Sequence, residues 1–186
     1  LLTRHGANLA ARNAAGWTAA QLAQAKGVAA DPSKAAPAES LDPSARLAGL
    51  RKDKRFEGWP DLSVAAWSGD LKLVELLTAS ADVNAHDSAG QTALSRAVDE
   101  GHTEVVAALV AHGAHDDSTL PGGQTSLQVA IAKNYDKIAF ALLAAGAPTD
   151  AVDAQGRFAL GLAASRGNAE RTSRLLEHHA DPNIRG

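Results

Sequence analysis

Short stretches of this chain place apolar residues at helical spacing and separate them with glycine. Leu94, Ala97 and Val98 lie three or four positions apart, which predicts one apolar face of a short helix. Gly101 is expected to end that helix, and Glu104 to begin a second one. The inward residues of the second helix are predicted to be Val105, Val106, Leu109 and Val110. The pattern therefore indicates paired short helices rather than strands.

The same phrase recurs along the chain: a glycine, a variable residue, usually threonine, and then small apolar residues. Its leading glycines are Gly16, Gly58, Gly90, Gly123 and Gly156. The spacings between them are therefore 42, 32, 33 and 33 residues. A fixed period of this length is the mark of a repeat array in which each unit buries its apolar face against its neighbours.

The clearest copy, residues 87–119, also carries the signals that begin and end helices. Gly90 suits a tight turn that needs a permissive backbone, and Thr92 can cap the first helix with its hydroxyl. Gly113 suits a left-handed cap at the end of the second helix. Helices this short are unstable alone in water, so burial between repeats must stabilise them.

These residues resemble the ankyrin repeat family. The resemblance rests on the period and on the segments Ala81-Asp82-Val83-Asn84 and Gly101-His102-Thr103-Glu104-Val105-Val106. It implies an all-α ankyrin-repeat solenoid of helix-turn-helix units joined by hairpin loops, the fingers. The fingers are expected near residues 85–90, 117–123 and 151–156.

We expect one ankyrin-repeat domain over residues 1–186, with about five repeats and a partial one before them. Residues 1–12 would be the tail of an earlier repeat. The repeats would then cover residues 13–54, 55–86, 87–119, 120–152 and 153–186, and are called repeats one to five below. Both ends of the chain cut the pattern, so we expect either a fragment of a longer protein or an array that stops abruptly.

Repeat one contains added material. Its spacing of 42 exceeds a 33-residue unit by 9, and the composition of residues 29–40 is typical of a loop. A helix is expected to restart at Asp42-Pro43, with Asp42 as its cap and Leu47 and Leu50 facing inward. The loop could carry function or could be a tolerated insertion, and the sequence leaves both alternatives open.

Two helix ends lack the usual glycine. Ser80 in repeat two and His179 in repeat five stand near the position of Gly113, so a left-handed conformation there would be strained. The last helix also carries Arg171, Thr172 and Arg174 where repeat three has apolar residues. Residues 168–179 therefore resemble the polar outer face of a terminal capping repeat.

Composition excludes several classes of function. The 186 residues carry a formal charge of −3, which gives no reason to expect a nucleic-acid partner. With no cysteine there is no thiolate nucleophile or thiolate metal site, and no apolar run is long enough to insert in a membrane. A cytoplasmic location is the working expectation, and a missing signal peptide is the alternative because the chain begins without methionine.

We expect neither catalysis nor a cofactor, and no small-molecule substrate. No serine lies in a Gly-x-Ser-x-Gly elbow, and Gly122-Gly123 is not followed by the Lys-Ser or Lys-Thr of a phosphate loop. His112 and His115, with Asp116 and Asp117, could in principle hold a divalent metal. An exposed polar turn is the preferred interpretation of that cluster, so no metal site is predicted, and His102 is expected to make a structural hydrogen bond.

The resemblance implies that partners bind to the finger tips and to the exposed side of each first helix. By register, the residues expected to form this protein-binding surface are Trp17, Phe56, Glu57, Trp59, Trp67, His86, Gln91, Asp99, Glu100, Lys133, Arg157 and Arg166. All three tryptophans are among them, and tryptophan is enriched in interface hot spots. The alternative is that these tryptophans pack on the adjoining finger or are covered by residues 29–40.

The leading hypothesis is therefore a protein-protein interaction module that binds a partner protein through its concave face and fingers. Two alternatives stay open: a cognate inhibitor or immunity-type protein of a bacterial enzyme or toxin, and the substrate-recruiting part of a larger enzyme.

Overall fold

Pairs of short helices follow one another along the chain and are joined within each pair by a tight turn. The computed structural model describes residues 42–115, 120 and 122–184, which fall within one unit of the chain, Asp42–Gly186. Its helices are α2 (Pro43–Leu50), the 3-10 turn η2 (Lys54–Phe56), α3 (Asp61–Ser68), α4 (Leu71–Thr78), α5 (Ala93–Glu100), α6 (Thr103–Ala111), α7 (Ser126–Ala132), α8 (Asp136–Ala144), α9 (Ala159–Ser165) and α10 (Ala169–Glu177).

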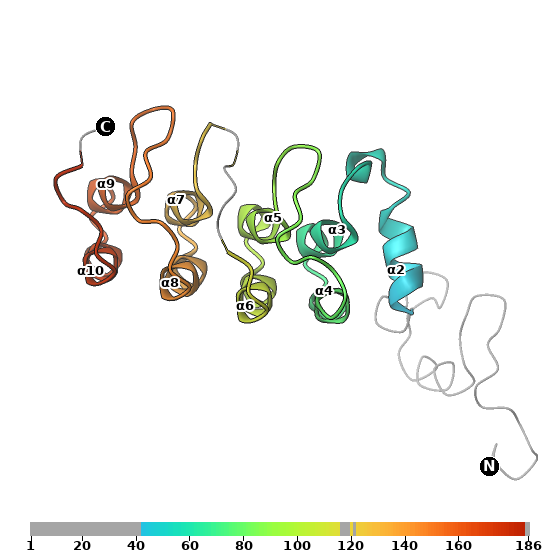
Figure 1. Cartoon of the computed structure of the whole chain (residues 1–186). Helices are drawn as coiled ribbons and strands as arrows, with labels where there is room; N and C mark the ends of the chain where they lie inside the picture. Colours follow the sequence, from blue (N-terminus) through green and yellow to red (C-terminus); the bar gives the residue numbers. More distant parts are fainter. Residues whose placement is uncertain (1–41, 116–119, 121, 185–186) are drawn as a thin grey trace, which may run out of the picture. The chain divides into compact units, whose positions relative to one another are not determined.

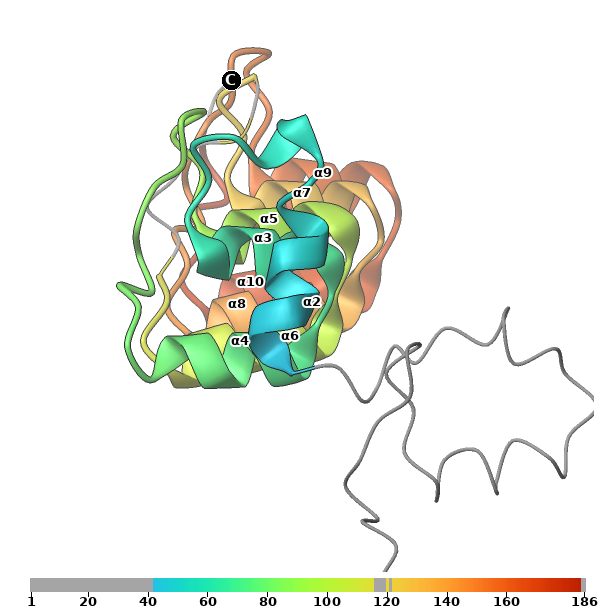
Figure 2. The same ribbon diagram turned by 90° about the vertical axis from the view of Figure 1, so that its right-hand side faces the viewer.

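From α3 onward the helices form two rows (Figure 1; Figure 2). The first helices of the repeats, α3, α5, α7 and α9, pack side by side in one row, and α4, α6, α8 and α10 form the other. The described residues contain only helices and two isolated bridges, Leu120 with Gln124 and Val152 with Phe158. The all-α array of helix pairs expected from the period is thus confirmed.

The hydrophobic core lies between the two rows and runs from repeat to repeat. The predicted stripe of α5 is buried, as are Val105, Val106 and Leu109 of α6, while Val110 is half-buried and packs against the core. Each helix has only 7 to 9 residues. This continuous burial therefore supplies the stability that such short helices lack in isolation.

The cap predicted at Thr92 forms at the first helix of repeat three. The Thr92 hydroxyl accepts a hydrogen bond from the Ser95 N–H, while Ser95 Oγ accepts one from the Thr92 N–H. Thr125 and Gln128 repeat this reciprocal arrangement at α7. Gln128 then also donates to the carbonyl oxygens of Ala151 and Arg157, at 2.8 Å each, which joins repeat four to the finger of repeat five.

The fingers are tight turns closed by a backbone hydrogen bond across the glycine. In repeat three the Asp87 N–H donates to the Gln91 carbonyl, and Gly90 has a φ of 74° that favours glycine. Asp87 Oδ1 accepts from the N–H groups of Ala89 and Gln91, and Asp153 makes the same pair of bonds with Gln155 and Arg157. Most of the finger expected at 117–123 lies outside the described residues.

Helix α2 begins at Pro43, as the sequence predicted. Asp42 stands at the N-cap, but its side chain makes no capping hydrogen bond, so that part of the prediction is wrong. Leu47 and Leu50 are half-buried against the core. Helix α2 is inclined to the helices of the two rows, which Figure 1 views nearly end-on. The added loop at residues 29–40 lies outside the described residues.

The two helix ends without glycine behave differently. His179 adopts the left-handed conformation, with a φ of 65°, as does Asn134 with a φ of 62°. In repeat two, α4 ends at Thr78 with Ala79 in a right-handed conformation, and Ser80 has no positive φ. The strain that was expected at Ser80 is therefore absent.

The prediction of a polar outer face for residues 168–179 is wrong at Arg171. Arg171 is buried, with 4% of its surface exposed, and faces repeat four. Its Nη1 donates to Asn134 Oδ1 at 2.8 Å, and its Nε makes an ion pair with Asp136. A guanidinium can replace an apolar side chain here because repeat four supplies oxygen acceptors for it. Thr172 is half-buried and Arg174 is exposed.

Candidate protein-binding surface

Three aromatic side chains meet where the η2 turn joins the first helix of repeat two. Phe56, in η2, lies edge-on to Trp59, with 5.3 Å between ring centres, and edge-on to Trp67, at 5.1 Å. Phe56 is buried, whereas Trp59 and Trp67 are half-buried. Edge-to-face contacts of this kind are favourable and orient the rings. The two tryptophans are therefore held on a buried phenylalanine and keep part of their surface in contact with solvent.

Each tryptophan also carries an arginine on its ring. The Arg55 guanidinium lies 4.8 Å from the centre of the Trp67 ring, and that of Arg96 lies 3.7 Å from the centre of Trp59. Arginine is attracted to the negative face of an aromatic ring, most strongly to tryptophan. Arg55 comes from the η2 turn and Arg96 from α5 of the next repeat. The cluster thus joins repeats two and three.

Each of these arginines also makes an ion pair with a carboxylate. Arg96 Nε and Nη2 donate to Asp87 Oδ2 at 2.9 and 2.5 Å, and the Asp87 side chain is fully buried. Arg55 Nε donates to Asp53 Oδ2 at 2.8 Å, and the Arg55 N–H donates to Asp53 Oδ1 at 2.9 Å. The hydrogen bonds from the Arg55 side chain and N–H lower the pKa of Asp53, and the same ion pair raises the pKa of Arg55.

Two residues expected on the presented surface are buried, so their prediction as exposed contacts is wrong. Phe56 is 3% exposed because its ring supports the two tryptophans. Gln91 is 4% exposed because it lies in the closing turn of its finger, where its N–H and carbonyl both bond to Asp87. A register argument identifies the position on the finger but not which way a side chain packs.

Other expected surface residues are accessible but already paired. Lys133 Nζ donates to the Asp99 carbonyl oxygen and to Asp99 Oδ1, both at 2.6 Å. Arg157 Nε donates to Asp153 Oδ2 at 2.8 Å, and Arg166 Nη1 donates to the Ile131 carbonyl at 2.8 Å. Lys133 of repeat four thus neutralises Asp99 of repeat three, and Arg166 of repeat five binds the backbone of repeat four.

Glu57, His86 and Glu100 are exposed as predicted. Trp17 lies outside the described residues. Sequence reasoning missed Arg55 and Arg96, because the register pointed to positions next to each glycine and not to the arginines that stack on them. The signal that could have revealed them is the presence of arginine three residues before Gly58 and six after Gly90.

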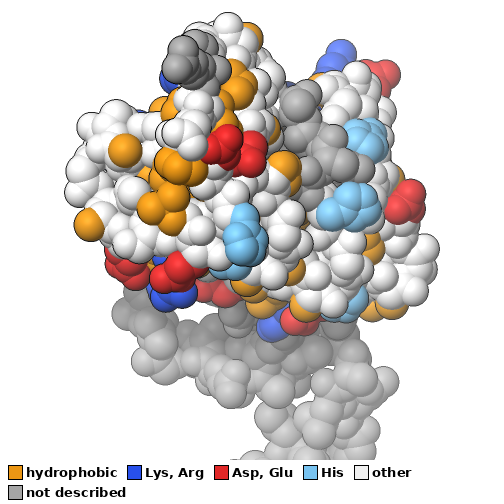
Figure 3. Space-filling model, turned by 60° about the vertical axis from the view of Figure 1, so that its left-hand side comes forward, with side chains coloured by type: hydrophobic (Ala, Val, Ile, Leu, Met, Phe, Trp, Pro, Cys, Tyr) orange, Lys and Arg blue, Asp and Glu red, His pale blue; other side chains and the backbone are white. Residues whose placement is uncertain are grey.

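The histidines do not make a metal site in the described part of the chain. His102 Nε2 lies 3.0 Å from the Trp67 carbonyl oxygen, the structural role expected of it. His112 Nδ1 lies 2.9 Å from the Ala108 carbonyl. Several histidine side chains lie apart from one another on one side of the molecule (Figure 3), and the described residues contain no group of three potential ligands. Asp116 and Asp117 fall outside those residues.

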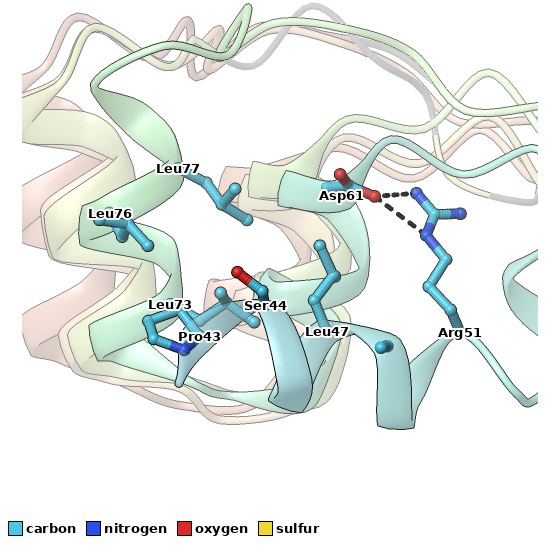
Figure 4. A pocket seen from close by; sticks show the side chains of 9 residues that line it. Pro43, Ser44, Leu47, Arg51, Asp61, Leu73, Leu76 and Leu77 are labelled. Atoms are coloured by element: carbon cyan, nitrogen blue, oxygen red, sulfur yellow. Dashed lines mark hydrogen bonds and ion pairs between the residues drawn. The ribbon is translucent and has the colours of Figure 1, made fainter. Parts of the chain in front are cut away.

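A shallow apolar groove lies between α2 and α4. It has a volume of about 340 Å³ and is lined mainly by Leu47, Leu73, Leu76 and Leu77 (Figure 4). Leu76 is the most exposed large apolar side chain of the described residues, at 54%. Arg51 and Asp61 lie at one end of the groove and bind each other. Sequence reasoning did not predict this groove, because it results from the inclination of α2.

No helix in the described residues is long and apolar enough to cross a membrane.

Comparison with protein families finds ankyrin repeats in three copies over residues 62–153 and a further ankyrin repeat over residues 155–186. No curated protein matches the chain. The family matches cover the same helix pairs and fingers that the structure describes, from α3 to α10. The chain therefore belongs to the ankyrin repeat family.

Proposed function

We propose that this chain binds a partner protein through the surface formed by the η2 finger (residues 52–60), the neighbouring finger at 85–90 and the C-terminal ends of the first helices. Ankyrin repeats are generally protein-protein interaction modules and are typically not catalytic. The observation that supports this particular surface is the tryptophan pair, Trp59 and Trp67, half-exposed and fixed in orientation by Phe56 and two arginines.

Tryptophan suits such a surface because it covers a large apolar area and has only two rotatable side-chain bonds. Here both rings are already held by neighbours, so binding would cost little further side-chain entropy. A pre-ordered aromatic pair can thus contribute more of its contact energy to affinity than two mobile side chains would.

The surroundings of the pair resemble the polar rim of an interface. Lys52, Lys54 and Glu57 are exposed on the η2 finger, and Glu100 is exposed at the end of α5. An apolar centre surrounded by charged residues is the usual anatomy of a protein-protein contact. We therefore expect the partner to place an apolar side chain against the tryptophans and polar groups around them.

The proposal is tested by capturing partners from a lysate of the native host with the immobilised wild-type protein and with a Trp59→Ala, Trp67→Ala double variant. We expect the double variant to lose the partner that the wild type retains, with a loss in affinity of at least about a hundredfold, since hot-spot tryptophans each contribute about 2 kcal/mol or more. Isothermal titration with the purified partner measures the loss.

The matched control is Leu76→Ala with Leu176→Ala, which removes exposed apolar side chains from α4 and α10 on the other row. This control should bind as the wild type does. Binding that survives in the folded tryptophan variant, as judged by unchanged far-ultraviolet circular dichroism, would contradict the proposal. One stoichiometric partner would favour a cognate inhibitor, whereas many partners would favour a scaffold.

A further inference from the structure

Arg51, at the C-terminal end of α2, binds two backbone carbonyls of the η2 finger and the carboxylate of Asp61 at the start of α3. Its Nη1 donates to the Phe56 carbonyl at 3.2 Å and its Nη2 to the Trp59 carbonyl at 2.8 Å. Its Nε donates to Asp61 Oδ1 at 2.9 Å, and Nη2 contacts the same oxygen (Figure 4). One guanidinium thus connects α2 to the turn before α3.

The two carbonyls belong to the residues that form the aromatic cluster. Between them, the Trp59 N–H donates to the Phe56 carbonyl at 3.2 Å, and Gly58 turns the chain with a φ of 76°. Arg51 therefore closes this turn from outside and fixes the direction in which both peptide units point. The position of the Trp59 ring on Phe56 depends on that direction.

Only arginine can make this set of contacts. Its planar fork presents several N–H donors in fixed directions, whereas lysine offers a single ammonium on a flexible stem. A carboxylate and two carbonyls held by one side chain require several N–H donors that point in different directions within one plane. Arg51→Lys would keep the charge next to Asp61 but could not hold both carbonyls in the same geometry.

We propose that Arg51 is a positioning residue for the binding surface and that it makes α2 part of the binding site. The inference rests on the proposed function of the tryptophan pair. Without Arg51, the Phe56 and Trp59 carbonyls turn to solvent, the turn samples other conformations, and Trp59 leaves its pre-ordered orientation. Partner affinity then falls although no contact residue has changed.

A second arginine of α2 provides a matched control. Arg46 makes an ion pair with Asp70 at the start of α4, so it attaches α2 to the helix rows and does not contact the finger. Leu47 and Leu50 of α2 also pack against the core, so α2 keeps its place, and Arg51 its contacts, when Arg46 alone is removed. Comparing variants of the two arginines therefore distinguishes the attachment of α2 from the positioning of the finger.

The test uses the full chain with Trp17→Phe, so that fluorescence reports on Trp59 and Trp67 alone. Arg51→Ala, Arg51→Lys and Arg46→Ala are compared by hydrogen exchange of the amides in 56–61 and by acrylamide quenching. In Arg51→Ala and Arg51→Lys we expect exchange in 56–61 to accelerate about tenfold or more and quenching to rise. In Arg46→Ala both should stay at the wild-type level.

The binding readout uses a peptide selected from a random phage-displayed library against the wild-type protein, chosen because Trp59→Ala with Trp67→Ala abolishes its binding. We expect Arg51→Ala and Arg51→Lys to weaken this peptide about tenfold, and Arg46→Ala to leave its affinity within twofold. Equal weakening by Arg46→Ala and Arg51→Ala would overturn the inference, since it would mean that the finger only follows α2. Wild-type affinity in Arg51→Ala would overturn it as well.

The selection also separates failure of the inference from failure of the proposed function. If no selected peptide depends on the tryptophan pair, the proposed binding surface is wrong and the inference falls with it. If the binding of the selected peptides depends on the tryptophans but is unchanged in the Arg51 variants, the proposed surface is supported and only the positioning role of Arg51 is refuted.

Discussion

The guanidinium of Arg96 lies 3.7 Å from the centre of the Trp59 ring while two of its nitrogens hold the buried carboxylate of Asp87. Asp87 in turn accepts the N–H groups of Ala89 and Gln91 and so closes the second finger. One side chain therefore stabilises a finger turn in repeat three and positions a tryptophan in repeat two. The proposed binding surface is built across the junction of two repeats, and neither repeat alone contains it.

Arg96→Ala should be among the more destabilising single changes in the chain. It leaves the fully buried Asp87 carboxylate without its cation, and breaking a buried pair in this way costs on the order of 3 kcal/mol. Urea unfolding followed by circular dichroism measures the change. Arg174→Ala is the control, because Arg174 also lies over a ring, that of Phe140 at 5.3 Å, but is exposed. A loss below about 1 kcal/mol for Arg96→Ala would contradict the prediction.

Two serines at the same position of neighbouring repeats should respond in opposite ways to alanine. Ser95 Oγ takes part in the capping box with Thr92, so Ser95→Ala should cost about 1 kcal/mol. In repeat two, Pro60 replaces the threonine and has no N–H, and the buried Ser63 Oγ is without a partner. Ser63→Ala should therefore be neutral or stabilising by up to about 1 kcal/mol. Thermal unfolding of both variants compares them directly, and a destabilised Ser63→Ala would refute this explanation.

Acid should destabilise the protein partly through Asp153. Burial raises the pKa of this carboxyl. Hydrogen bonds from the Arg157 N–H, the Arg157 side chain and the Gln155 N–H together lower it by more than burial raises it, so the pKa of Asp153 is below its ordinary value. A lowered folded-state pKa stabilises the protein above the ordinary carboxyl pKa of about 4. That stability is lost as the pH falls from there through the folded-state pKa.

Asp153→Asn tests this pH dependence by urea unfolding between pH 7 and pH 2.5. The variant should be less stable than the wild type at neutral pH, and the two curves should converge in acid. Glu75→Gln removes an exposed carboxylate of α4 and should follow the wild-type curve. A constant gap between wild type and Asp153→Asn across this range would show that the carboxylate does not contribute in this way.

His179→Gly should stabilise the chain. His179 ends the last helix pair with a φ of 65°, which costs a side-chain-bearing residue about 1 kcal/mol relative to glycine. Greater freedom of glycine in the unfolded chain offsets part of that gain. Asn134→Gly, at a φ of 62°, should gain less because asparagine tolerates this conformation. Differential scanning calorimetry would rank the two, and a lower melting temperature for His179→Gly than for wild type would argue against strain there.

The sequence alone determined the repeats. The leading glycines, the cap at Thr92 and the apolar stripe of α5 each depend on residues close together in the chain, so local spacing predicted the helix pairs and fingers that the structure describes. It also predicted the start of α2, because proline at the first turn of a helix follows a local rule.

Only the tertiary structure decided which side chains are exposed and which are buried or bound by residues of a neighbouring repeat. Phe56 turns inward under Trp59 and Trp67, Gln91 is enclosed in its own turn, and Arg171 is buried because repeat four offers it oxygen acceptors. Arg51 of α2 binds the carbonyls of Phe56 and Trp59 in the next turn, and Arg96 of the following repeat lies on the Trp59 ring. Such relationships depend on how one repeat packs on the next, and a periodic pattern repeats the positions without specifying that packing.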